Sequence, residues 1–224
     1  MHTHNHVIVQ KQSTKLLGKV VSNTLQHKEH INTVINTVNY RIHKLRHIAP
    51  YTTFKTRLLI TNAIIISSLT HFLPQLINAH KNQLAKLQTL QLKSARLVIG
   101  SPCFKWSTAR MLSTCNWHSI YHLITEQSTT LIHKLVTDKQ PMALYKMLTS
   151  SMHSTQDNRY THRLFMAHRA KTDSLNDSLM YKALSLYNSL TPQITALSMS
   201  EFQTRIKEHV FLTYSPDSVP IRVT

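Results

Sequence analysis

The stretch that decides the fold is LAKLQTLQLKSARLVIG, residues 84–100. At helical spacing its apolar side chains fall on one face, whereas Lys86, Lys93 and Arg96 fall on the opposite face. Gly100 marks the end, because glycine tolerates a left-handed cap and the proline two residues later cannot continue a helix. The stretch therefore predicts a helix that enters a core on one side and presents positive charge on the other.

The composition favours helices elsewhere as well. The chain has 224 residues, enough for one domain or two small ones, and 42% of them are hydrophobic. Only 2 glycines argue against a barrel, propeller or dinucleotide fold that depends on glycine. The predicted fold class is mainly α, a helical bundle preceded by a short N-terminal β-hairpin.

Residues 7–21 predict that hairpin, because β-branched residues at 7–9 and 20–21 flank a polar turn. The apolar periodicity then predicts helices over residues 26–48, 52–79, 84–100, 108–113, 117–137, 142–148, 174–190 and 200–212. Pro74 is expected to kink or divide the second helix, because it removes a backbone donor. Ser200 and Gln203 predict a capping box at the start of the last one.

The net charge points to an anionic partner. The chain carries 26 lysines and arginines against 9 acidic residues, a formal charge of +17. No acidic residue lies between Glu29 and Glu126. The basic residues of that span are Arg41, Lys44, Arg46, Lys55, Arg57, Lys81, Lys86, Lys93, Arg96, Lys105 and Arg110. Such a span favours nucleic-acid binding, with a merely solvated basic surface as the alternative.

Cysteine usage and hydropathy predict a compartment. Two cysteines exclude a disulfide framework and suit a reducing environment. No signal peptide is recognisable, and the most apolar segment, residues 58–69, is too short to span a bilayer. The expected location is intracellular, nuclear or cytoplasmic, with no secretion and no membrane partner.

No pattern predicts catalysis or a bound metal. Adjacent acidic residues, a phosphate-binding glycine loop and a GxSxG elbow are all lacking in the sequence. Cys103, Cys115, His118 and His122 could supply zinc ligands, but their spacing is not that of a zinc finger, which favours ordinary packing. We therefore predict no catalytic residues, no metal ligands and no cofactor in this chain.

A resemblance emerges from several segments together. KLLGKVVSNTLQHKEHI, residues 15–31, resembles the segment just after the catalytic core in reverse transcriptases of non-LTR, LINE-type (jockey-like) retrotransposons. Leu17 and Gly18 match that family's [YL]LG motif, and His30 and Ile31 match the "Hi" that follows.

Further segments continue the resemblance in order. Residues 57–72 are similar to a helix ending in "S.l.Y", with His71 in place of tyrosine. Residues 87–100 and 111–123 resemble the next two elements, and residues 184–194 and 202–211 the last two. The positions that match are Arg96, Gly100, Trp117, Asn188, Ser189 and Leu190, whereas Tyr187 and Thr191 depart from the family's "lWNsLP".

The resemblance implies a thumb region without its palm. The family's catalytic aspartates, and the Mg²⁺ they bind, belong to a palm that would lie upstream, so this fragment of an RNA-directed DNA polymerase is not expected to be catalytic by itself. The implied partners are the backbone of RNA or an RNA–DNA duplex and the missing palm and fingers. The residues predicted to contact phosphates are Arg41, Lys44, Arg46, Lys86, Lys93 and Arg96.

The corresponding organisation has five parts. They are a hairpin remnant of the palm at 1–25, a thumb-like bundle at 26–150, a mobile loop at 151–173, C-terminal helices at 174–212 and a disordered tail at 213–224. Two alternatives stay open at this point: a free-standing basic helical adaptor that binds nucleic acid, and a helical scaffold for protein interactions.

Overall fold

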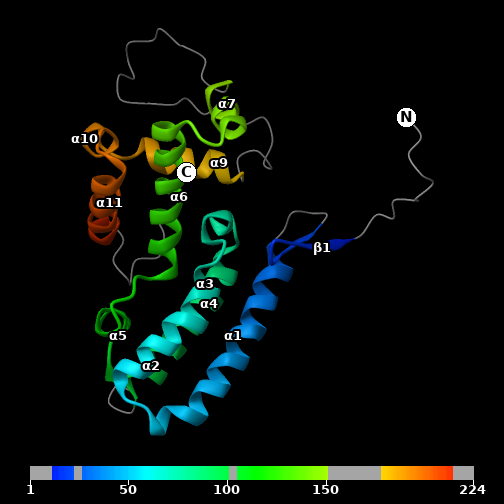
Figure 1. Cartoon of the computed structure of the whole chain (residues 1–224), viewed down its shortest axis with the longest axis vertical. Helices are drawn as coiled ribbons and strands as arrows, with labels where there is room; N and C mark the ends of the chain where they lie inside the picture. Colours follow the sequence, from blue (N-terminus) through cyan, green and yellow to red (C-terminus); the bar gives the residue numbers. More distant parts are fainter. Residues whose placement is uncertain (1–11, 23–26, 101–104, 151–177, 214–224) are drawn as a thin grey trace, which may run out of the picture.

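A computed structural model describes residues 12–22, 27–100, 105–150 and 178–213. Its fold is the predicted one, mainly α with an N-terminal antiparallel hairpin of β1 (Ser13–Leu16) and β2 (Lys19–Ser22) (Figure 1). In chain order, the first α-helices are α1 (Lys28–Ile48), α2 (Phe54–Thr61), α3 (Ser67–Thr70), α4 (Lys81–Ile99), α5 (Thr108–Thr114) and α6 (Ile120–Asp138). The remaining described helices are α7 (Met142–Ser150), α9 (Leu179–Asn188), α10 (Pro192–Thr195) and α11 (Met199–Thr213).

The hairpin turns at Leu17 and Gly18, not at the predicted polar turn. Leu16 pairs with Lys19, so the loop has two residues, with φ of 48° at Leu17 and 88° at Gly18. Two positive φ angles match the twist of the flanking strands, and glycine adopts such an angle at little cost. The predicted polar turn is therefore wrong, because the two-residue loop needs positive φ angles and Gly18 provides one of them. The predicted strand at residues 7–9 lies outside the described residues.

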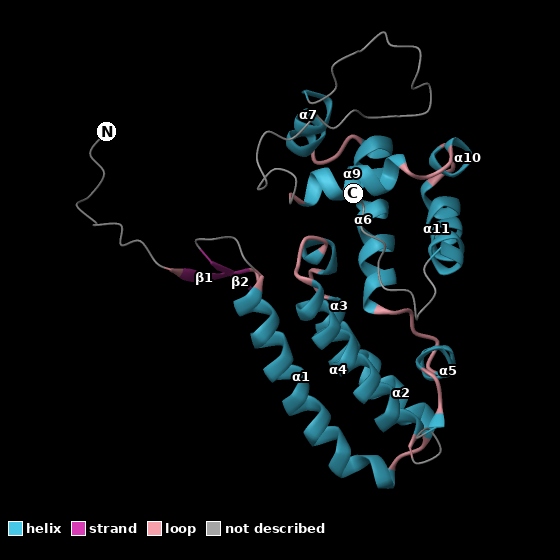
Figure 2. Ribbon diagram, turned by 180° about the vertical axis from the view of Figure 1, so that it is seen from behind, coloured by secondary structure: helices cyan, strands magenta, loops and turns pink. Residues whose placement is uncertain are grey.

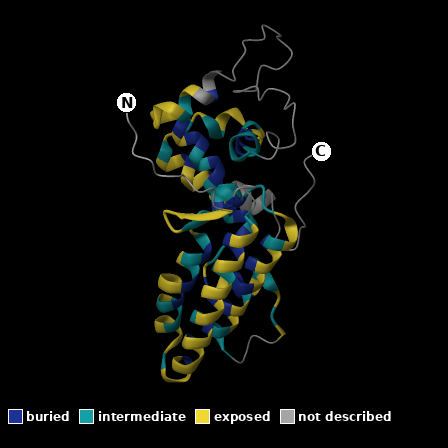
Figure 3. Ribbon diagram, turned by 90° about the vertical axis from the view of Figure 1, so that its right-hand side faces the viewer, coloured by how far each residue is buried: buried dark blue, intermediate teal, exposed yellow. Residues whose placement is uncertain are grey.

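The first core lies between α1, α4 and the segment that joins them (Figure 2). The predicted stripe of α1 enters it through Ile31, Val38, Ile42 and Leu45, all of them buried. In α4 the buried Leu84 and Leu87 belong to this core, as the periodicity predicts, whereas the buried Ala95 and Val98 pack with Met111 and Cys115 in a smaller cluster. Figure 3 shows buried residues on the inner faces of these helices and exposed ones on their outer faces.

The second predicted helix ends earlier than expected. α2 continues through a π-helical turn, η2 (Asn62–Ile66), into α3, which stops at Thr70. Phe72 then adopts a left-handed conformation with φ of 65°, and Pro74 starts the 3₁₀ turn η3 (Leu73–Leu76). The predicted segment is thus interrupted, but the break comes at Thr70, before Pro74, so the proline is not what divides it.

One arginine joins the ends of three segments of this half. Arg57 Nε donates to the Val98 carbonyl near the end of α4, at 3.0 Å. Its Nη1 donates to the carbonyl of Ala49, the C-cap of α1, at 2.8 Å, and to that of Thr52 at 3.3 Å. Carbonyls at helix ends lack partners within the helix, so a cation that satisfies two such ends stabilises both.

The second core forms around the other half of α6. Ile120 and Ile124 at the start of α6 belong to the first core, whereas Ile132 and Leu135 pack with residues of α7, α9 and α11. The second core thus uses residues on both sides of the predicted domain boundary at 150. Within the described helices, none is both long enough and apolar enough to cross a membrane.

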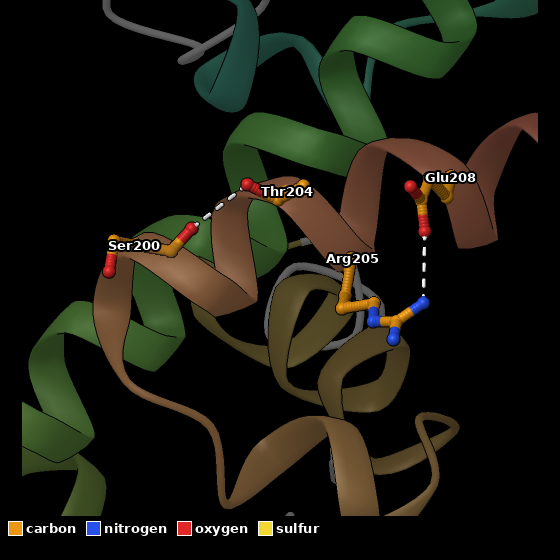
Figure 4. A network of polar contacts seen from close by, with 4 residues as sticks. All are labelled: Ser200, Thr204, Arg205 and Glu208. Atoms are coloured by element: carbon orange, nitrogen blue, oxygen red, sulfur yellow. Dashed lines mark hydrogen bonds and ion pairs between the residues drawn. The ribbon is translucent and has the colours of Figure 1, made fainter.

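The cap of the last helix, α11, lies two residues before the predicted capping box. Ser198 precedes α11, and its backbone N–H and hydroxyl both donate to Glu201 Oε2, at 3.2 and 2.7 Å. These hydrogen bonds lower the pKa of Glu201. Ser200 instead lies inside the first turn, where its carbonyl accepts from Thr204 Oγ1 at 3.2 Å (Figure 4). The capping residues are therefore Ser198 and Glu201, not Ser200 and Gln203.

Candidate nucleic-acid interface

The outer side of α4 carries three cations in one row. Lys86, Lys93 and Arg96 are all exposed, and the buried residues of the helix lie on its other side. Seven residues make two helical turns, which places Lys86 and Lys93 roughly 10 Å apart along the axis, with Arg96 about one turn further on. We call these three residues the α4 basic face.

Polar contacts fix α4 against the start of α6. Gln91 is buried, and its amide nitrogen donates to the His118 carbonyl at 2.7 Å. Gln88 accepts from the backbone N–H of Ile120 at 2.8 Å, and its amide donates to Gln91 at 3.0 Å. Gly100 ends the helix with φ of 87°. The α4 basic face is therefore presented by a helix held at both its core side and its end.

The three predicted cations of α1 do not lie in one row. Arg41 is half-buried, and its Nη1 donates to the Ile64 carbonyl and to Ser68 Oγ, which ties α1 to the π-helical segment. Lys44 is exposed, with its ammonium 5.4 Å from the centre of the Tyr40 ring. Arg46 is exposed too, but two residues along a helix it faces a different side from Lys44. Phosphate contact by these residues stays a prediction.

The residues that carry the resemblance occupy distinctive backbone and packing positions. Leu17 stands at the hairpin tip with 87% of its surface exposed. Trp117 donates through its indole N–H to Asn62 Oδ1 of the π-helical turn, at 2.8 Å. At the end of α9, Leu190 is buried, Asn188 is half-buried and the Ser189 hydroxyl donates to the Leu186 carbonyl at 2.6 Å.

A cationic junction lies where the hairpin meets the helices, and the sequence analysis missed it. Lys19 donates to Gln75 Oε1, and His27 Nε2 bonds Asn78 Oδ1 at 2.8 Å. His30 is 4% exposed, and its Nδ1 has no hydrogen-bond partner among the described residues. Burial lowers the pKa of His30, and the nearby charges of Lys19, His27 and His71 lower it further. The pKa of His27 is lowered by burial and by Lys19, against an opposing hydrogen bond to Asn78.

The junction predicts a loss of stability in mild acid. His27 and His30 titrate below the ordinary value of 6.5 when folded, so the unfolded chain binds protons more readily between the two pKa values. The stability that these two histidines contribute is fully present above about pH 6.5. It is lost as the pH falls through their pKa values in the folded protein. We expect the urea midpoint to fall between about pH 7.5 and about pH 5.5, and to fall less in His30→Gln. If the urea midpoint of His30→Gln fell with pH as steeply as that of the wild type, this assignment would be contradicted.

The histidines and cysteines do not assemble a metal site within the described residues, where no group of three or more histidine, cysteine or acidic side chains is suitably placed. His118 and His122 stack with ring centroids 4.4 Å apart, and Cys115 is buried. Burial, with a smaller contribution from His118, lowers the pKa of His122 to about 4, so this ring is neutral at neutral pH. Cys103 lies outside the described residues.

Comparisons with protein-family models, with curated proteins and with solved structures found no match. The function is therefore inferred from the residues themselves, above all from the α4 basic face. Exposed lysine and arginine side chains along one side of a helix can neutralise phosphates of a nucleic-acid strand without reading its sequence.

Proposed function

We propose that this chain is a thumb-like fragment of a retrotransposon reverse transcriptase that binds the backbone of a template–primer duplex through the α4 basic face. It holds the nucleic acid, and bond formation belongs to a palm supplied by another segment. The observation that carries the proposal is the exposure of Lys86, Lys93 and Arg96 along one side of a rigidly held helix. The order of the family-like segments supports the specific family.

The positive charge of the α4 basic face suits binding to a nucleic-acid backbone. Each phosphate neutralised by lysine or arginine releases condensed counterions, which drives binding without base recognition. The α4 basic face lies within the long span that has no acidic residue. An acidic neighbour in sequence would compete with phosphate for these cations, and between Glu29 and Glu126 the chain provides none. The expected ligand is therefore a sugar–phosphate backbone, recognised by charge and position.

The salt dependence of binding tests this role. Lys86→Gln/Lys93→Gln is expected to weaken binding to an RNA–DNA duplex and to reduce the slope of log affinity against log salt by about 2, one for each lysine. Fluorescence anisotropy between about 50 and about 200 mM salt measures it.

The matched control removes the same charge from the other half of the protein. Lys134→Gln/Lys207→Gln also replaces two exposed lysines, one in α6 and one in α11. This variant should keep a slope close to that of the wild type. Equal slope changes in the two variants would mean that net charge alone governs binding, and the assignment of the α4 basic face would be wrong.

The hairpin tip is the feature that suits a palm partner. Leu16 and Leu17 are both exposed, and every residue of β1 is exposed as well. A two-stranded ribbon is marginally stable alone, so an apolar surface beside it would stabilise it. A free-standing nucleic-acid-binding adaptor is the alternative that uses the same α4 basic face. The genomic sequence upstream separates them: a palm reading frame favours the fragment, and its absence favours the adaptor.

A further inference from the structure

A second surface, on the outer side of α1, combines aromatic rings with positive charge. Its residues are spaced at i, i+3, i+4, i+7 and i+11, which places them on one side of the helix and its 3₁₀ extension η1 (Ala49–Tyr51). We call this surface the α1 aromatic stripe, and its members are Tyr40, His43, Lys44, His47 and Tyr51.

The rings of the α1 aromatic stripe are open to a ligand. Tyr40 is 63% exposed and Tyr51 is 89% exposed, although tyrosine rings usually bury much of their apolar surface. The imidazoles of His43 and His47 meet edge to face, with centroids 4.7 Å apart. The Lys44 ammonium lies 5.4 Å from the centre of the Tyr40 ring, so the stripe places two pairs of neighbouring side chains and the exposed Tyr51 ring along one side of the helix.

We propose that the α1 aromatic stripe binds single-stranded nucleic acid by stacking unpaired bases on Tyr40 and Tyr51. This rests on the proposed function, because it assumes that the protein is a nucleic-acid-binding one. It adds a second ligand class: the α4 basic face binds a duplex backbone by charge, and the stripe binds bases that no duplex covers.

The chemistry of the stripe favours a single strand over a duplex. In a duplex the flat faces of the bases are hidden between their neighbours, and only phosphates and groove edges are accessible. A single strand offers those faces to aromatic side chains, which stack on any base because every base has a flat π face. Lys44 and the acid-free span around it would attract the phosphates that accompany those bases.

The length of the stripe fits a short single-stranded segment. Tyr40 and Tyr51 are eleven residues apart in sequence, which corresponds to about 16 Å along a helical axis. The two tyrosines therefore stand at opposite ends of the stripe, with His43, Lys44 and His47 between them. This spacing predicts contact with two non-adjacent bases of one strand, with the lysine near the intervening phosphates.

Three probes of equal length separate stacking from charge. They are a single-stranded RNA of about ten nucleotides, an abasic strand with the same phosphates, and a blunt RNA–DNA duplex. Tyr40→Ala/Tyr51→Ala is expected to weaken binding of the single-stranded RNA at least about tenfold and to leave the affinities for the abasic strand and the duplex unchanged. Tyr40→Phe/Tyr51→Phe keeps the rings and should retain wild-type affinity.

Each other outcome has a definite meaning. An unchanged affinity for single-stranded RNA, or an equal loss on the abasic strand, would overturn the stacking proposal. The duplex probe with Lys86→Gln/Lys93→Gln reports on the proposed function separately. If that variant binds the duplex normally while the tyrosine variant loses single-stranded RNA, the α4 assignment fails and the α1 aromatic stripe stands. Since both tyrosines are exposed, thermal melting should show all variants folded.

Discussion

Phe202→Ala is expected to destabilise the protein by about 3–5 kcal/mol, the usual cost of deleting a fully buried aromatic ring. Phe202 is 0% exposed in α11, and its ring stacks on the His133 imidazole of α6 with centroids 3.9 Å apart and planes 3° from parallel. The centroid of the Tyr187 ring lies 6.1 Å from that of Phe202, and the Tyr187 hydroxyl is hydrogen-bonded to His133 Nδ1 at 3.0 Å. Because whole domains are stable by only about 5–15 kcal/mol, urea unfolding should show a large loss.

A spectroscopic readout distinguishes this packing role from a general defect. Burial lowers the pKa of His133. Removal of the Phe202 ring should admit water and move that pKa back toward its ordinary value, which nuclear magnetic resonance of the imidazole can follow. Phe54→Ala makes the same chemical change at a partly exposed position at the start of α2 and should cost less than about 1 kcal/mol. Equal costs at the two sites would refute the described second core.

Arg57→Ala is the second large change, with an expected loss of about 2–3 kcal/mol. The guanidinium satisfies carbonyls at the ends of α1 and α4, and hydrogen bonds from a charged donor are worth about 1.5–3 kcal/mol each. Because Arg57 is only half-buried, water can replace some of its hydrogen bonds in the variant. The expected loss is therefore smaller than the summed energies of those bonds. Urea unfolding followed by circular dichroism measures it.

Two further variants test whether the loss of stability comes from the carbonyl contacts of the Arg57 guanidinium. Arg57→Lys should be intermediate, because an ammonium group cannot reproduce the planar fork that reaches separate carbonyls. Arg205→Ala removes an arginine whose side chain is 66% exposed and whose ion pair with Glu208 measures 3.2 Å (Figure 4). Such surface pairs contribute at most about 1 kcal/mol. If Arg57→Ala cost no more than about 1 kcal/mol, as expected for Arg205→Ala, the contacts of Arg57 with the ends of α1 and α4 would contribute little.

Helix positions followed from the sequence where the apolar stripe was long. Most of the apolar residues that the periodicity predicts for α1 and α4 are buried, because each stripe has only one side that can leave water. The buried polar residues His30, Gln91 and Ser94 were not predicted. The predicted positions of the hairpin turn and of the last helix cap were less reliable. The turn at Leu17 and Gly18 and the cap at Ser198 depend on backbone angles and single hydrogen bonds, for which residue type gives competing signals.

Contacts between distant parts of the chain could not be predicted at all. Arg57 and Arg41 read as two more members of a basic span, but both donate to backbone carbonyls of other segments. The hydrogen bonds of Lys19 with Gln75 and of His27 with Asn78 join segments about fifty residues apart. No local pattern encodes such pairings, since they depend on how the helices pack. The row formed by the α4 basic face could be predicted, because it lies on one helix.

The sharing of α6 by two cores has a thermodynamic consequence. The first turns of α6 belong to one core and its last turns to the other, so unfolding of the whole helix would expose apolar surface in both cores. The two halves should therefore respond together to mass action. A polyanion bound on α4 would also protect the aromatic cluster around Phe202 against unfolding, although no atom of the ligand comes near it.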